Sequence, residues 1–196
     1  MAVPVLDDRP VRVIFGIGSL AEVRTEVLAL GRRALLVTGR HEQAAADVAS
    51  ALLGADLVGE LREVAQHVPV QLAADAVSLA RGLRADVLVT VGGGSATGLA
   101  KAVALEVGLP VLAVPTTYAG SEMTPIWGLT DGEGKTTGRD ARVLPRTVIY
   151  DPSLTRSLPP DITAASGMNA LAHAIEALYA ATCGSSALWT PACGSR

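Results

Sequence analysis

The sequence predicts an α/β fold: a doubly wound parallel sheet that binds a nucleotide. Short apolar, β-branched runs alternate with longer helical runs along most of the chain, which is the pattern of a parallel sheet with crossover helices. The segment Gly92-Gly93-Gly94-Ser95 follows one such run and opens a helix, so its backbone N–H groups are available to a phosphate. The chain has 196 residues, of which 49% are apolar and 18% charged, enough for one domain and the beginning of a second.

The elements are expected in the following order. Strands are predicted at 11–15, 33–38, 56–58, 87–91 and 111–114, and helices at 19–30, 42–53, 70–83 and 96–107, the last with Ser95 as its N-cap. After Pro115 the pattern changes to a hairpin over 126–137 and a strand over 147–150, which together are expected to form an antiparallel appendage. A helical region then begins at Pro159 and Pro160 and extends to Tyr179.

This order predicts two domains. Residues 1–150 are expected to form a nucleotide-binding α/β domain with a β-hairpin appendage. Residues 151–196 are expected to form the start of an all-helical domain, incomplete and with an atypical tail after Ala180.

Composition excludes several classes of function. The formal net charge is −3 and no long basic run is present, so neither nucleic acid nor an anionic membrane surface is expected as a partner. No apolar run has the length of a membrane span, and the first ten residues lack the pattern of a signal peptide, so a cytoplasmic location is expected by default. Cys183 and Cys193 do not have the spacing of a disulfide framework or a zinc site.

Three polar loops follow predicted strands and would outline one crevice, because ligands of parallel sheets lie beyond the carboxyl ends of the strands. They are 38–41, 92–95 and 116–121. The glycines of 92–95 do not have the G-x-G-x-x-G spacing, and Lys101 lies too far after them for a P-loop. A turn that is rich in glycine only because of packing therefore stays open as an alternative. No acidic residue lies within 38–41 to bind a ribose 2′-hydroxyl. A 2′-phosphate prefers neutral or basic residues at this place, so Arg40 is compatible with NADPH.

A second group of polar residues lies on the later helix. Asn169, His173 and Glu176 are spaced i, i+4 and i+7, which places them on one helix face. An asparagine amide is a weak metal ligand, so a metal is disfavoured here. His173 is either a satisfied packing residue or a functional group, and the spacing does not decide between them.

Four segments together resemble the iron-containing alcohol dehydrogenase superfamily and, within it, the maleylacetate reductases. They are GGGSATGLAK, PTTYAGSEMTPIWGLT, GRDARVLPRTVIYDPSLTRSLP and SGMNALAHAIEALYA, and the resemblance runs from about Val11 to Tyr179. Most metal-dependent members carry Asp where this chain has Gly98 and Asn169. The resemblance therefore implies a branch that works without a metal, and no metal ligand is expected.

The resemblance implies an NADH- or NADPH-dependent reduction of maleylacetate to 3-oxoadipate in the degradation of aromatic compounds. His173 would face the substrate and donate or relay a proton. The cofactor-binding residues implied are Gly93, Gly94 and Ser95 for the pyrophosphate, Thr116, Thr117, Tyr118 and Ser121 for the nicotinamide side, and Thr38 and Gly39 for the adenosine ribose.

The implied substrate is a small dicarboxylate, which favours cations nearby. The candidates are Lys135, Arg139, Arg142 and Arg146, each of which is otherwise a solvated surface charge. A homodimer is expected if the full-length enzyme is formed.

Two other readings stay open. Because the resemblance stops near Tyr179, the chain could be a nucleotide-binding remnant that turns nothing over. A metal-dependent alcohol or glycerol dehydrogenase is the third reading, and Asn169 counts against it.

Overall fold

A computed structural model describes residues 5–6, 11–39, 42–62, 64, 68–132, 134–156 and 158–179. Its strands are β1 (Val5–Leu6), β2 (Arg12–Phe15), β3 (Ala34–Thr38), β4 (Leu57–Leu61), β5 (Val87–Gly92), β6 (Val111–Pro115), β7 (Ile126–Asp131), β8 (Gly134–Arg139) and β9 (Thr147–Tyr150). Its helices are α1 (Val23–Leu30), α2 (Gln43–Leu53), α3 (Val70–Gly82), α4 (Gly94–Val107) and α5 (Pro160–Tyr179). Short 3-10 turns lie at Ser19–Glu22, Gly54–Asp56, Ser121–Met123, Ala141–Val143 and Pro152–Thr155.

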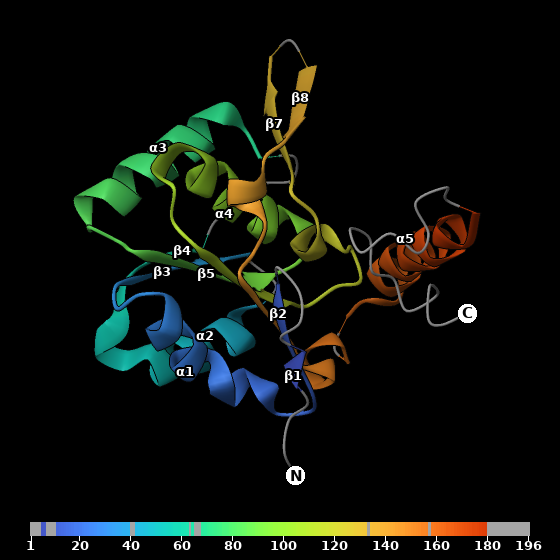
Figure 1. The fold of residues 1–196 in the computed structure, drawn as a ribbon, viewed down its shortest axis with the longest axis horizontal. Helices are drawn as coiled ribbons and strands as arrows, with labels where there is room; N and C mark the ends of the chain where they lie inside the picture. Colours follow the sequence, from blue (N-terminus) through green and yellow to red (C-terminus); the bar gives the residue numbers. More distant parts are fainter. Residues whose placement is uncertain are drawn as a thin grey trace.

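One large sheet forms the centre of the described part of the chain. Its strand order is β1-β2-β9-β6-β5-β3-β4, in which every neighbouring pair is parallel except β1 with β2. Helices α3 and α4 cover one face and α1 and α2 the other (Figure 1). The predicted doubly wound α/β fold is confirmed.

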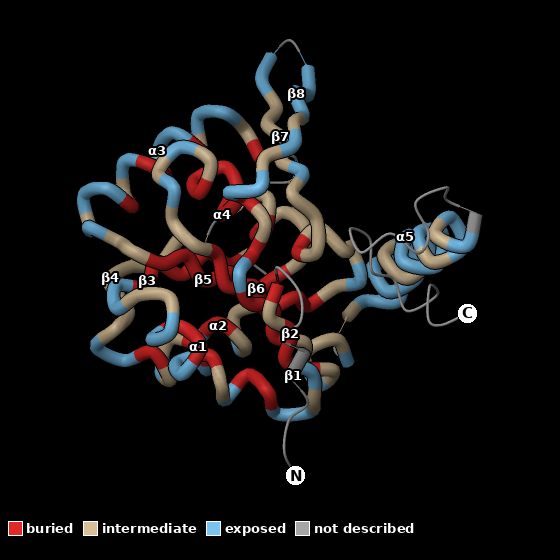
Figure 2. Tube along the Cα trace, viewed as in Figure 1, coloured by how far each residue is buried: buried red, intermediate tan, exposed pale blue. Residues whose placement is uncertain are grey.

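Burial on both faces explains why the central strands are almost entirely apolar. Every residue of β3, β5 and β6 is buried, and Figure 2 shows these strands as the buried centre. Alternate residues of β3 point to opposite faces, so Leu36 packs with α1 and α2 while Leu35 and Val37 pack with α3 and α4. A continuous apolar run is therefore the correct pattern for these strands.

The chain reverses its direction of winding between β3 and β5. From β3 it passes through α2 to β4 at the edge, and it then returns through α3 to β5, which pairs with the other side of β3. The helices that follow β3 and β5, α2 and α4, lie on opposite faces of the sheet (Figure 1). The loops at the carboxyl ends of these two neighbouring strands therefore start side by side but lead to opposite faces of the sheet. This place is the topological switch point, where such folds bind ligands.

The prediction for the segment after Pro115 is correct for the hairpin and wrong for the last strand. Strands β7 and β8 form the expected antiparallel hairpin, a separate sheet that projects from the domain (Figure 1). Strand β9 instead lies inside the large sheet, parallel to both β2 and β6. Val148 and Ile149 are fully buried there, because a short apolar run gains more from a central position than from an exposed ribbon. The short strand β1 was not predicted.

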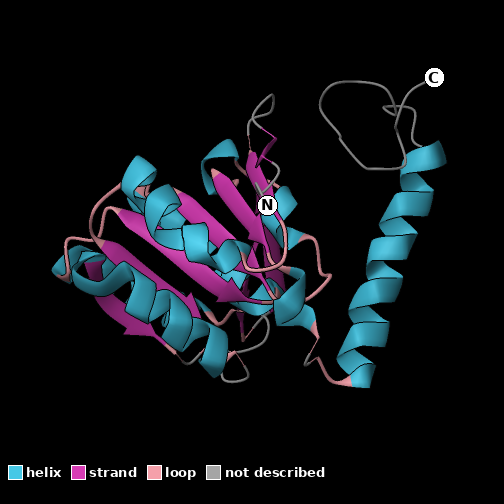
Figure 3. Ribbon diagram, turned by 90° about the horizontal axis from the view of Figure 1, so that it is seen from below, coloured by secondary structure: helices cyan, strands magenta, loops and turns pink. Residues whose placement is uncertain are grey.

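Helix α5 confirms that a helix begins after the sheet, but it projects away from it (Figure 3). Met168, Leu171 and Leu178 are 63%, 50% and 56% exposed. The division into domains at residue 150 stays a prediction, and the tail with Cys183 and Cys193 lies outside the described residues. Within the described residues, no helix combines the length and the apolar character needed to cross a membrane.

Asp151 joins the end of β9 to the turn that follows β2. Its Oδ1 accepts hydrogen bonds from the Ser153 backbone N–H (3.0 Å) and hydroxyl (2.6 Å), and its Oδ2 accepts one from the Leu20 N–H at 3.2 Å. Burial raises the pKa of Asp151, but the hydrogen bonds from Ser153 and Leu20 outweigh burial and hold the pKa below its ordinary value.

We predict that Asp151→Asn lowers the free energy of unfolding at pH 7 by about 1–2 kcal/mol, because the charged acceptor of these bonds is lost. A carboxyl group whose pKa is lower in the folded state stabilises the fold above its unfolded pKa, and this stabilisation is lost as the pH falls through the folded pKa. The difference between wild type and variant should therefore shrink below about pH 4. Urea unfolding at pH 7 and pH 3 measures it.

Asp75→Asn on the exposed face of α3 is the matched control and should leave unfolding unchanged at both pH values. A difference between Asp151→Asn and wild type that stays constant from pH 7 to pH 3 would contradict the prediction.

Candidate functional site

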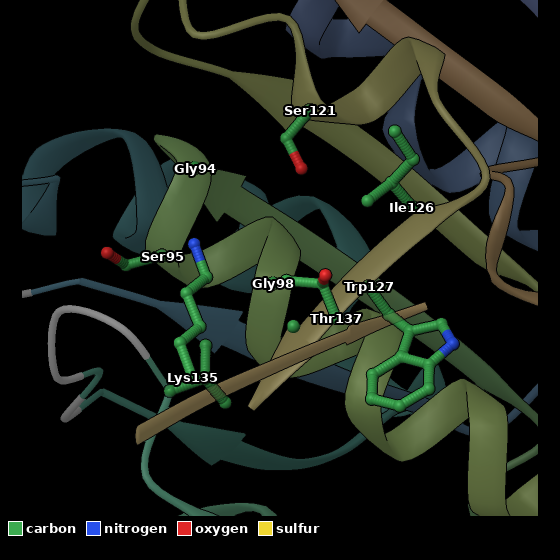
Figure 4. A pocket seen from close by; sticks show the side chains of 10 residues that line it. Gly94, Ser95, Gly98, Ser121, Ile126, Trp127, Lys135 and Thr137 are labelled. Carbon is green, nitrogen blue, oxygen red and sulfur yellow. The ribbon is translucent and has the colours of Figure 1, made fainter. Parts of the chain in front are cut away.

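The turn between β5 and α4 presents the first N–H groups of a long helix without a side-chain cap. Gly93 is the N-cap residue and α4 begins at Gly94, so the prediction that Ser95 caps the helix is wrong. Glycine permits this earlier start, since Gly92 adopts φ +157°, which side chains rarely allow. The Ser95 side chain is consequently available to line a pocket beside the helix (Figure 4). The positive end of α4 and its N–H groups favour an anion at this turn.

The loop after β6 packs directly on this turn. The Thr116 N–H donates to the Gly92 carbonyl at 3.2 Å. A Cβ atom on Gly93 would lie 2.9 Å from Thr117 Cγ2, whereas one on Gly94 would lie 3.5 Å from Ala119 Cβ. Gly93 is thus required by a close approach, and the structure brings Gly93, Gly94, Thr116 and Thr117 together as predicted.

The end of β3 completes the crevice with a residue that the sequence reasoning missed. Thr38 is fully buried, and a Cβ on Gly39 would lie 2.5 Å from Glu42 Oε2. The Thr116 hydroxyl lies 3.4 Å from Glu42 Oε1. Glu42 precedes the first turn of α2 and its side chain reaches back to Gly39, so an acidic residue at the N-cap of the predicted helix was the available signal. Arg40 and His41 lie outside the described residues.

A buried ammonium group holds the loop that contains Ser121. Lys101 on α4 is fully buried, and its Nζ donates to the carbonyls of Ser121 (2.5 Å), Thr124 (2.7 Å) and Ile126 (2.9 Å). Burial lowers the pKa of Lys101 to about 8, and the nearby carboxylate of Glu122 opposes this shift.

Glu122 extends this buried cluster towards β9. It is 4% exposed, and its Oε1 accepts the Tyr150 hydroxyl proton at 2.8 Å. Burial raises the pKa of Glu122, and burial also raises the pKa of Tyr150. The cluster ties α4, the Ser121 loop and β9 together.

A pocket of about 360 Å³ lies between the start of α4 and the hairpin (Figure 4). Its polar lining includes Ser95, Ser121 and Lys135, and the indole of Trp127 forms part of its apolar wall. Of the four predicted cations only Lys135 lines this pocket; Arg142 forms an ion pair with Asp140 at 2.7 Å instead. Tyr118 is not part of the lining, and its hydroxyl donates to Thr155 at 3.1 Å.

His173 is not brought to this crevice by any interaction found among the described residues. Its side chain is 63% exposed, and its Nδ1 lies 3.4 Å from Glu176 Oε2. The link between α5 and the crevice is Asn169, whose side-chain N–H donates to the Ala119 carbonyl at 3.2 Å. The catalytic role of His173 stays a prediction.

Residues 10–152 match the family described as iron-containing alcohol dehydrogenase. This chain belongs to that family. It is 55% identical over 170 residues to a maleylacetate reductase of Burkholderia cepacia, an alignment that covers 86% of this chain and 48% of the relative. The chain therefore spans about half the length of the curated relatives it matches.

Solved structures of similar proteins have the same fold. Maleylacetate reductase from Agrobacterium tumefaciens superposes with a TM-score of 0.83 at 43% identity, covering 92% of this chain and 52% of that one. Sulfoacetaldehyde reductase from Bifidobacterium kashiwanohense, determined in complex with NAD+, gives a TM-score of 0.80 at 27% identity and covers 95% of this chain and 57% of that one.

Membership of this family corrects the expectation that no metal is involved, because iron is the metal that the family description names. The expectation rested on Asn169 and Gly98 alone, whereas a metal site draws ligands from several elements. The described residues do not by themselves fit an iron site: no group of three or more His, Cys, Asp or Glu side chains is close enough together to hold one.

We predict that Lys101→Met lowers the free energy of unfolding by about 3 kcal/mol or more, because it leaves buried carbonyls and the Glu122 carboxylate without their partner. Denaturant unfolding at pH 7 measures the change. Lys135→Met, the same substitution at an exposed position, should leave the midpoint unchanged. Equal midpoints for Lys101→Met and wild type would show that the cluster does not stabilise the fold.

Proposed function

We propose that this chain is the dinucleotide-binding part of an oxidoreductase that uses NADH or NADPH to reduce maleylacetate to 3-oxoadipate. The observation that carries the proposal is the convergence of three loops at the switch point of the sheet, one of them a glycine turn with uncapped helix N–H groups. The named activity of the 55% identical relative supports the choice of substrate. The NAD+ complex of the 27% identical structure supports the choice of cofactor.

Each predicted residue has a part in this proposal. The N–H groups at Gly94 and Ser95 bind the pyrophosphate, which can approach because Gly93 has no side chain. Thr116, Thr117, Tyr118 and Ser121 lie along the nicotinamide side, and Thr38 and Gly39 lie beside the adenosine ribose.

Lys135 is the group in this chain best placed to attract a dicarboxylate, since its ammonium lines the pocket next to Ser95 and Ser121 (Figure 4). The bound dinucleotide supplies a hydride to one carbon of the substrate double bond. The electron pair left on the neighbouring carbon, delocalised into the adjacent carbonyl group, then takes up a proton, and His173 is the proposed donor.

The assay that tests the proposal follows the loss of NADH or NADPH absorbance by residues 1–196, with and without maleylacetate, and includes ferrous ion because the family is iron-containing. Turnover that depends on maleylacetate supports the full proposal. Dinucleotide binding without turnover supports the second candidate, a nucleotide-binding unit, which is favoured by the exposed apolar residues of α5. Failure to bind either dinucleotide contradicts both.

We predict that Gly93→Ala weakens NADH binding at least about tenfold, because the new methyl group collides with Thr117 and obstructs the diphosphate. The backbone of Gly93, at φ −81° and ψ −161°, is one that alanine adopts readily, so a steric cause is isolated. Gly82→Ala at the end of α3, where a new methyl group would meet nothing within 4 Å, is the control and should leave the affinity unchanged. Fluorescence titration of NADH measures both, and equal affinities would place the diphosphate elsewhere.

We predict that His173→Gln reduces turnover by about 10²-fold or more while leaving the Kd for NADH unchanged. The reason is that a proton donor acts on the substrate, and among the described residues His173 pairs with Glu176 and forms no hydrogen bond or ion pair with the three cofactor loops. Steady-state rates and NADH titration of the same preparation separate the two effects. An increase in the Kd without loss of turnover would assign His173 to the cofactor instead.

A further inference from the structure

Glu42 occupies the N-cap position of α2 but does not cap it. Its side chain accepts no hydrogen bond from the N–H groups of the helix. Acidic residues at this position normally do so, since the exposed N–H groups and the helix dipole both attract a carboxylate. The position of the Glu42 side chain therefore has another cause.

The carboxylate lies in the crevice between the three loops. It is so close to Gly39 that a Cβ there would lie 2.5 Å from Oε2, and a Cβ on Gly92 would lie 3.8 Å from Glu42 Cδ. Oε1 is 3.4 Å from the Thr116 hydroxyl, a long hydrogen bond. The carboxylate thus touches the ends of β3, β5 and β6 at once.

One of its two oxygens has no hydrogen-bond donor among the described residues. Oε2 is buried and receives no hydrogen bond from any described residue. A buried carboxylate oxygen without a donor is unfavourable, so such an atom in a ligand crevice indicates a donor that arrives with the ligand.

The neighbouring residues fix the loop in this position. The Gln43 side-chain N–H donates to the Gly39 carbonyl at 3.0 Å, and the Gln43 carbonyl oxygen accepts from Arg62 at 2.7 Å. Gln43 thus holds the Gly39 backbone, and the space that a side chain at Gly39 would need is occupied by the Glu42 carboxylate.

We propose that Glu42 accepts a hydrogen bond from the 2′-hydroxyl of the adenosine ribose and thereby selects NADH over NADPH. This assignment rests on the dinucleotide binding proposed above. A ribose hydroxyl supplies the O–H that Oε2 lacks, and a hydrogen bond to a carboxylate is among the stronger ones in proteins. A 2′-phosphate supplies no such donor at neutral pH and brings a charge of about −1.5 to −2 against the carboxylate.

The decisive experiment titrates the 196-residue chain with NADH and with NADPH by fluorescence, for wild type, Glu42→Gln and Glu106→Gln. Wild type should bind NADH at least about tenfold more tightly than NADPH. Glu42→Gln keeps the size of the side chain but removes its charge, so NADH should bind more weakly, NADPH more tightly, and the preference should fall to about threefold or less. Glu106→Gln, the same change at the exposed far end of α4, should keep the wild-type ratio.

The outcomes separate this assignment from the proposed function. If wild type binds both dinucleotides equally well, or if Glu42→Gln keeps the wild-type ratio, the assignment is overturned while dinucleotide binding stands. If wild type binds neither dinucleotide, the proposed function is overturned and the assignment with it. Circular dichroism and urea unfolding of Glu42→Gln establish that the variant is folded in each comparison.

Discussion

The candidate site depends on one constraint: β3, β5 and β6 lie side by side and run in the same direction. Their carboxyl ends therefore meet at one edge, and the loops that follow them must share the space there. Since all three strands are buried on both faces, most of their side chains are apolar, and most polar side chains of this part of the chain lie in those loops. Reversal of the winding between β3 and β5 then opens the crevice in which Gly93, Thr117 and Glu42 come together.

The loop after β6 is the least regular wall of this crevice, and a buried polar cluster fixes it. Lys101 loses its hydration on burial, but its ammonium has three carbonyl acceptors and a carboxylate nearby, which offset much of that cost. Tyr150 anchors the same carboxylate to β9. The misassigned strand β9 is thus part of the support of the site, because only its central position in the sheet brings Tyr150 to Glu122.

The family description names iron, whereas the geometry of the described residues concerns the places proposed for the dinucleotide and the substrate. The glycine turn and the pocket with Lys135 lie within the described residues, and they are the places to which the proposed function assigns the dinucleotide and the anionic substrate group. The iron that names the family has no complete ligand set there. Helix α5 carries Asn169 and His173 on a largely exposed surface. The chain spans about half the length of the curated relatives it matches.

The sequence by itself determined the alternation of strands and helices, the glycine turn and the hairpin, because these depend on hydrophobic period and on glycine, which act over a few residues. It also placed Thr38, Gly93 and Thr116 at strand ends, and the family resemblance was correct. Only the tertiary structure decided that β9 lies in the middle of the sheet, that α4 begins before Ser95, and that Glu42 reaches over Gly39 into the crevice. These features depend on which strands pair and on how the Glu42 side chain fills the space beside Gly39 and Gly92. Such contacts between distant segments produce no periodic pattern in the sequence.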